Sequence, residues 1–125
     1  MDFSWKSFGE PEADADLRGV IGSLHPTQYR TVSRVLWNTR QIEAQLAESK
    51  GLVGYSLRAK LFPRRFWAVA VWENDESLQS FVEGNPHAGI RSALKGAMEE
   101  SWFKTFDVKT EEVPIDIDEA ITRVE

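Results

Sequence analysis

The chain has 125 residues, a net charge of −5 and no cysteine, with 42% apolar and 28% charged residues. These values are typical of one globular domain, and they exclude disulfides, thiolate nucleophiles and cysteine-ligated metal sites. Lys and Arg are not clustered as nucleic-acid binding requires, and no apolar run is long enough to cross a membrane. The acidic start lacks the apolar core of a secretion signal, so we expect a cytoplasmic protein.

Residues 1–30 are predicted to form an N-terminal arm that precedes one folded domain over residues 31–125. The stretch between residues 10 and 16 is acidic and short of large apolar side chains. Such composition favours weak order. The sequence therefore predicts an arm whose role is open.

The first strand is predicted at Thr31–Trp37, because this stretch is rich in β-branched and aromatic residues. Neither of its faces is cleanly polar, which indicates a strand covered on both sides. Asn38 or Thr39 is a suitable cap for a helix that follows. Gly51 then provides the stop for that helix.

Two further strands are predicted at Leu52–Leu61 and Phe66–Trp72, joined by the basic link Lys60–Arg65. The link is too short for a crossover connection. The two strands are therefore predicted to pair antiparallel as a hairpin.

The rest of the chain predicts helices, a strand and a final helix. Asn74 or Asp75 caps a helix, and Asn85-Pro86 starts another whose first turn contains His87. Alternating aromatic and polar residues then indicate a strand at Ser101–Thr110. A short helix at Asp116–Val124 ends the chain.

This order of elements, β-α-β-β-α-β, predicts an α+β, ferredoxin-like fold with an antiparallel sheet. The helices should cover one face of the sheet. The other face also carries apolar residues and needs a cover, for which a second subunit is the simplest. The sequence therefore predicts a homodimer.

Four runs of the sequence resemble the antibiotic-biosynthesis-monooxygenase-like proteins of the dimeric α/β-barrel superfamily, and more closely a small branch near spheroidene monooxygenase. The runs are Gly51–Leu57, Phe66–Leu78, Phe81-Val82 and Pro86-His87. The resemblance covers roughly residues 30–110. It implies a dimer whose sheets meet face to face, with a pocket between sheet and helices in each subunit. Members of the family include cofactor-free oxygenases and haem-dependent enzymes.

His87 is the candidate catalytic residue, and it matches a histidine of the family. The stripe that it shares with Ile90 and Leu94 should point it toward the sheet. The helix N-terminus disfavours a protonated imidazole, and a neutral one can act as a base, a hydrogen-bond partner or a haem ligand. The alternative is a structural histidine that is bonded to a backbone carbonyl.

The candidate substrate-binding residues are cationic or aromatic. They are Arg34, Trp37, Tyr55, Trp72 and Arg91. A buried arginine needs an acidic partner, which can be a ligand, and aromatic side chains line sites for flat apolar molecules. The same aromatics can simply fill the core. Two histidines without a ligand motif predict no metal site.

Two functions from different classes remain open at this point. The first is a monooxygenase-like protein with a pocket for a flat apolar small molecule, with either no cofactor or haem. The second is a non-catalytic, dimeric ligand-binding or accessory protein. The fold does not distinguish them, because function depends on the site.

Overall fold

A computed structural model of the chain describes residues 2–62 and 64–125, without the side chains of residues 99 and 100. The elements of the described residues are β1 (Asp2–Ser7), β2 (Asp16–Pro26), α1 (Tyr29–Glu48), β3 (Leu52–Leu61), β4 (Arg64–Trp72), α2 (Asp75–Glu83), α3 (His87–Leu94), β5 (Met98–Lys109) and α4 (Ile117–Val124). Within this part of the chain, no helix has the length and apolar character needed to cross a membrane.

One sheet of five strands organises the molecule. Its strand order is β1-β3-β4-β2-β5, and each pair of neighbours is antiparallel. The succession β2, α1, β3, β4, α2–α3, β5 is the β-α-β-β-α-β order of the ferredoxin-like fold, so the predicted fold class is confirmed. β1 is an additional strand at one edge, and β4 lies in the middle.

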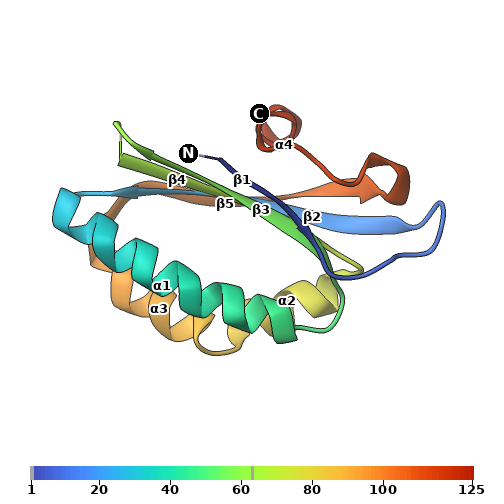
Figure 1. Cartoon of the computed structure of the whole chain (residues 1–125), viewed down its shortest axis with the longest axis horizontal. Coiled ribbons are helices and arrows are strands. Elements are labelled where there is room, and N and C mark those ends of the chain that lie inside the picture. Colours follow the sequence, from blue (N-terminus) through green and yellow to red (C-terminus); the bar gives the residue numbers. More distant parts are fainter. Residues whose placement is uncertain (1, 63) are drawn as a thin grey trace.

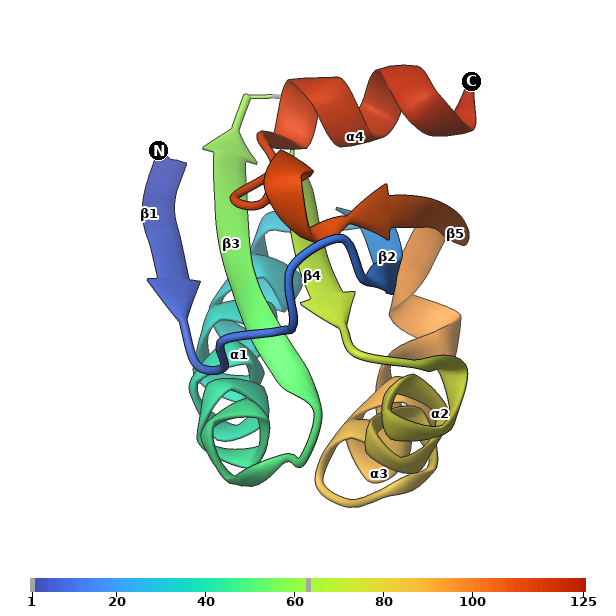
Figure 2. The same cartoon turned by 90° about the vertical axis from the view of Figure 1, so that its right-hand side faces the viewer.

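The helices lie on both faces of the sheet. Figure 1 shows α1, α2 and α3 below the sheet and α4 above it, and Figure 2 shows α4 running across the direction of the strands. Ile117 and Ala120 of α4 are buried against this upper face. The face expected to lie under a second subunit is therefore partly covered by the chain's own C-terminal helix.

The signals in residues 51–124 predict the elements well. The hairpin of β3 and β4 forms as expected. Asn74 caps α2, because its side chain accepts a hydrogen bond of 2.8 Å from the Ser77 backbone N–H. α3 begins directly after Pro86, and the predicted strand and C-terminal helix appear as β5 and α4.

The strand predicted at Thr31–Trp37 is wrong, because these residues form the first half of α1. Thr31, Val32 and Val35 are its buried positions there, and Leu46 continues the same stripe at helical spacing. Packing of this stripe on the sheet outweighs the β-propensity of single residues. The cap predicted at residue 38 or 39 is consequently inside the helix.

Residues 1–30, expected to form an arm, instead supply β1 and β2. β2 contains Gly19 and Gly22, which weaken the strand signal in the sequence. Each glycine makes room for an aromatic ring of β5: a Cβ at Gly19 would lie 2.5 Å from the Phe106 ring, and one at Gly22 would overlap the Phe103 ring. β2 can therefore pair with β5 because its two glycines leave room for the aromatic rings of β5.

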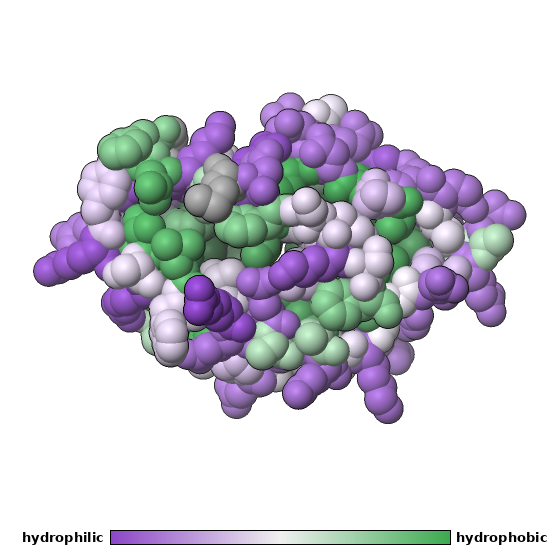
Figure 3. Space-filling view, in the orientation of Figure 1, coloured by the Kyte–Doolittle hydropathy of each residue, from purple (hydrophilic) through white to green (hydrophobic). Residues whose placement is uncertain are grey.

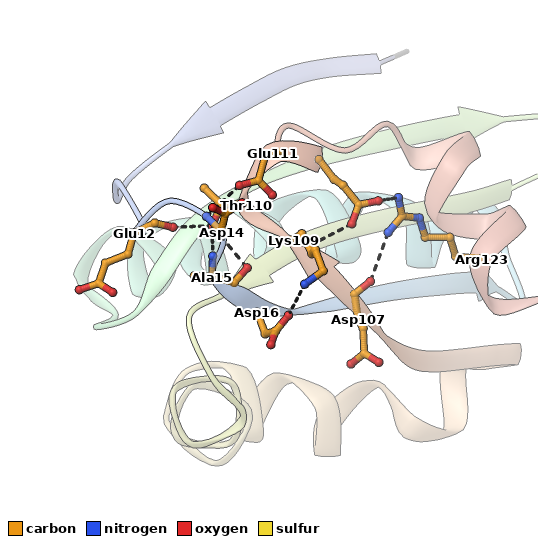
Figure 4. Close-up of polar contacts among 10 residues, drawn as sticks. Glu12, Asp14, Ala15, Asp16, Asp107, Lys109, Thr110, Glu111 and Arg123 are labelled. Carbon is orange, nitrogen blue, oxygen red and sulfur yellow. Dashed lines mark hydrogen bonds and ion pairs between the residues drawn. The ribbon is translucent and has the colours of Figure 1, made fainter.

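Polar contacts join the start of β2 to the end of β5 and to α4 (Figure 4). The Asp14 backbone N–H donates to Glu111 at 2.8 Å, and Lys109 donates to Asp16 at 2.9 Å. Arg123 of α4 donates to a backbone carbonyl of β5 at 3.2 Å. These exposed contacts fix register and position more than they stabilise the fold.

We expect Ile21→Ala to lower the free energy of unfolding by about 2–5 kcal/mol, because Ile21 is fully buried in a strand that pairs on both sides. Leu36→Ala is the matched control, since Leu36 is 44% exposed on α1, and it should change the free energy by less than about 0.5 kcal/mol. Urea unfolding followed by circular dichroism measures both. Equal effects would contradict the central position of β2.

Candidate functional site

Two separate apolar clusters fasten α1, α2 and α3 to the lower face of the sheet. One is formed by Leu46, Leu52, Tyr55, Trp72, Leu78 and Phe81. The other is formed by Val32, Val35, Phe66 and Leu94. We call them the Trp72 cluster and the Phe66 cluster.

One position of the middle strand between these clusters is exposed. Ala68 lies between Phe66 and Trp72 on the middle strand, with its side chain on the helix-facing side, and it is exposed. Its partners in register are Gly22 on β2 and Leu57 on β3. The corresponding position of the α1 stripe is the small, polar Thr39, whose hydroxyl donates to its own helix at 2.7 Å. We call this space the Ala68 gap.

His87 borders the Trp72 cluster. Its imidazole packs on Phe81 with 4.8 Å between the ring centres, and Phe81 in turn packs on Trp72 at 5.3 Å. The imidazole Nδ1 lies 3.1 Å from the Val82 carbonyl oxygen. Because a carbonyl only accepts, this contact requires a proton on Nδ1 and leaves Nε2 with its lone pair.

The surroundings of His87 favour the neutral imidazole. Burial lowers its pKa, the hydrogen bond to the Val82 carbonyl partly opposes that effect, and the nearby charge of Arg91 lowers the pKa further. The side chain is half-buried. The hydrogen bond to the Val82 carbonyl thus holds His87 in the tautomer that a general base needs. The same bond is the backbone contact that the alternative of a structural histidine predicts.

Gln45 of α1 connects the two helices around His87. Its amide nitrogen donates to the Phe81 carbonyl at 3.0 Å, and its amide oxygen accepts the His87 backbone N–H at 2.8 Å. The sequence gives no signal for this residue, because its partners lie 36 and 42 positions away.

Tyr55 lies in the Trp72 cluster, and its hydroxyl is hydrogen-bonded. The hydroxyl donates to Glu43 at 2.6 Å, and Lys6 pairs with the same carboxylate at 2.9 Å. Burial and Glu43 together raise the pKa of Tyr55. Burial raises the pKa of Glu43 as well, but the hydrogen bonds from Tyr55 and Lys6 outweigh this and lower it. Tyr55 is therefore a neutral wall residue.

Trp72 and Arg91 occupy very different positions. Trp72 is fully buried, so it can shape a site only as part of its wall. Arg91 lies exposed on α3, and its effect on the site is electrostatic, through the pKa of His87. The structure brings Tyr55, Trp72 and His87 together and leaves Arg91 at the surface.

Arg34 and Trp37 lie elsewhere, on the outer side of α1. Arg34 was expected mid-strand and buried, but it is exposed because the predicted strand is a helix. Both residues line a groove of about 450 Å³ between α1 and α3, which we call the α1–α3 groove. A second groove, of about 440 Å³, lies between α1 and α2 and includes Gln45 and Phe81. His87 lines neither groove.

Among the described residues, no group of three or more His, Asp or Glu side chains is arranged to hold a metal ion. The chain contains only two histidines and no cysteine.

Several solved structures share this fold. SnoaB from Streptomyces nogalater, a cofactor-independent oxygenase, superposes with a TM-score of 0.58 at 15% identity, over 74% of this chain and 92% of that one. A Deinococcus radiodurans protein described as a "putative antibiotic biosynthesis monooxygenase" superposes with a TM-score of 0.64 at 14% identity, over 73% and 91%. SO0527 from Shewanella oneidensis superposes with a TM-score of 0.65 at 10% identity, over 85% and 98%.

No protein-family model matches the sequence, and no curated protein matches it either. At these identities the structural likeness concerns the fold. The resemblance to the antibiotic-biosynthesis-monooxygenase-like proteins is confirmed at that level, and the closer branch near spheroidene monooxygenase stays a prediction.

We expect NMR of the imidazole nitrogens to show His87 as the Nδ1–H tautomer, with a pKa below its usual value near 6.5. The unfolded chain then takes up the proton first, so the free energy of unfolding should fall as the pH decreases from about 7 to 5. His87→Asn keeps a donor for the Val82 carbonyl but does not titrate, and it should lose less stability over this range. Identical pH dependence in the two proteins would contradict this assignment.

Proposed function

We propose that this protein is a cofactor-free oxygenase that takes a flat apolar small molecule into the Ala68 gap, with His87 as general base. The observation that supports this most directly is the exposed Ala68 at the centre of the middle strand. A sheet covered by helices normally buries such a position. Ala68 in the floor and Thr39 in the roof are small. Leu57 and the Phe103 ring, which lies over Gly22, flank the floor, and aromatic residues lie at both ends.

The walls suit a flat, apolar ligand. The Phe66 cluster bounds one end of the gap, and the Trp72 cluster, with Tyr55 and Phe81, bounds the other. Sites for small molecules are typically apolar with few polar groups, and they bury most of the ligand. Thr39 and His87 are the polar side chains to which we assign this role.

The chemistry follows from the state of His87. Its neutral Nε2 can remove the hydroxyl proton of a phenol, which leaves an electron-rich phenolate. The phenolate can react with dioxygen directly, and loss of water then gives a quinone: phenol plus O₂ yields quinone plus H₂O. The protein's part is to position the ring, keep water out and hold the proton acceptor. SnoaB, which shares the fold, is itself a cofactor-independent oxygenase.

The residues around His87 do not fit haem. Ligation through Nε2 needs a porphyrin-sized plane beside the imidazole. Phe81 packs on the ring, Trp72 lies fully buried behind it, and neither groove includes His87. We therefore propose no step through haem.

The second candidate function is ligand binding without turnover. Ligand binding without turnover is favoured because the polar atoms of the site already have partners within the protein. Tyr55 donates to Glu43, the His87 ring bonds to the Val82 carbonyl, and the His87 backbone N–H donates to Gln45. In this case the gap binds the same class of molecule, and His87 serves structure.

Oxygen uptake with a panel of naphthols, followed with an oxygen electrode in metal-free buffer, tests both functions. We expect turnover by the parent and a fall of roughly 100-fold or more in His87→Asn, the usual size of a general-base effect. Ala68→Leu should abolish turnover and weaken naphthol binding by filling the gap. Ala44→Leu adds the same side chain at an exposed site of α1 and should leave both unchanged.

The outcomes separate the candidates. Naphthol binding that is weakened in Ala68→Leu without oxygen uptake by any variant supports the second function and refutes the first. Naphthol affinity that is unchanged in a folded Ala68→Leu protein refutes the gap as the site for both. A saturable haemin absorbance shift that is lost in His87→Asn would overturn the cofactor-free assignment.

We also propose that the protein forms a homodimer through the part of the upper sheet face that α4 leaves open. Trp67 on β4 and Trp102 on β5 flank the buried Ser23 there, in register, and are only partly buried. Figure 3 shows a further apolar cluster at the end of the molecule where β3 meets β4, with Leu61 and Phe62 exposed. A second copy would cover these side chains.

Sedimentation velocity at micromolar concentration tests the dimer. The parent should sediment as a dimer and Trp102→Lys as a monomer, because a charge would replace a large apolar contact. Trp37→Lys is the control on the opposite layer, where Trp37 is 63% exposed, and should remain dimeric. A monomeric parent would contradict the proposal.

A further inference from the structure

We infer that the α1–α3 groove is a second binding site, specific for small aromatic anions such as aromatic carboxylates. Its walls are formed by Ser33, Arg34, Trp37, Asn38, Gly89, Ile90 and Ala93. Its volume of about 450 Å³ lies within the range of small-molecule sites. The site is independent of the proposed oxygenase function, because neither Ala68 nor His87 lines it.

The groove has an aromatic side chain in its α1 wall and aliphatic side chains in its α3 wall. Trp37 leaves 63% of its surface exposed, which is unusual for the largest apolar side chain. Ile90 and Ala93 lie across from it on α3, and Gly89 keeps that wall low. An indole wall facing small aliphatic groups accommodates one flat ring system by stacking.

Arg34 supplies the charge. In the part of the chain that the structure describes, no carboxylate pairs with it, whereas Arg18, Arg58 and Arg123 each bond to at least one. A guanidinium presents a planar set of donors that matches a carboxylate in two parallel hydrogen bonds. Arg34 is therefore available to an anionic ligand.

The charge around the groove is segregated. Residues 27–42 and 84–98, which contain both walls, carry five Lys and Arg residues and no Asp or Glu, in a chain whose net charge is −5. All five are exposed: Arg30, Arg34, Arg40, Arg91 and Lys95. This local positive potential attracts anions and repels cationic aromatics. The ligand class that fits is thus an aromatic ring with an anionic substituent.

Isothermal titration calorimetry with 2-naphthoate and its neutral isostere 2-naphthamide tests the site. We expect 2-naphthoate to bind the parent about tenfold more tightly than 2-naphthamide, as a charge-assisted hydrogen-bonded pair provides. Arg34→Gln should remove this difference. Arg40→Gln removes the same charge from the side of α1 near Glu43 and should preserve it.

Two further variants locate the ligand. Ala93→Leu should weaken both naphthalenes about tenfold or more by filling the groove, whereas Ala68→Leu should leave 2-naphthoate binding unchanged. Loss of 2-naphthoate binding in Ala68→Leu but not in Ala93→Leu would place the anion in the Ala68 gap and overturn the second site. Absence of 2-naphthoate binding to the parent, or equal affinity for the two probes, would also overturn it. Circular dichroism of each variant confirms that it is folded.

Discussion

Two apolar clusters hold the helices against the sheet, and the strand between them is less tightly covered. Phe66 packs with one end of α1 and Trp72 with the other, while Ala68 between them presents only a methyl group and is exposed. Burial of apolar area contributes about 25 cal/mol per Å², and the exposed methyl group of Ala68 contributes little of this stabilisation. A site where the chain forgoes such packing is typical of a functional constraint.

The position of His87 follows from the same arrangement. The Trp72 cluster fixes Phe81, Phe81 supports the imidazole, and the end of α2 supplies the carbonyl that holds Nδ1. Gln45 uses both ends of its amide to join α1 to α2 and α3. Three helices thus contribute to the orientation of one ring, and burial lowers the pKa of that ring. Preorganisation of this kind is what general-base chemistry requires, and it also explains why the contacts alone resemble those of a structural histidine.

The sequence predicts the second half of the chain better than the first, for physical reasons. From residue 51 onward the signals are local: Asn74 caps, Pro86 starts a helix, and apolar runs form a hairpin. Before residue 51 tertiary packing decides, because the glycines of β2 depend on rings of β5, and α1 is built from strand-forming residues at helical spacing. His87 could be placed from its helix start. Ala68 and Gln45 could not, because an exposed alanine and a bridging amide acquire meaning only from partners far away in the sequence.

α3 is the element that the two proposed sites share. Its first residue, His87, faces the Trp72 cluster, while Ile90 and Ala93 further along form a wall of the α1–α3 groove. Gln45 bonds the beginning of this eight-residue helix to α1, its last residue, Leu94, packs with Val32 and Val35 of α1, and other residues of the two helices line the groove. The bonded first turn therefore lies where proton transfer would need a defined geometry, and the groove lies where a ligand would need room. One short helix can meet both requirements because they fall on successive turns.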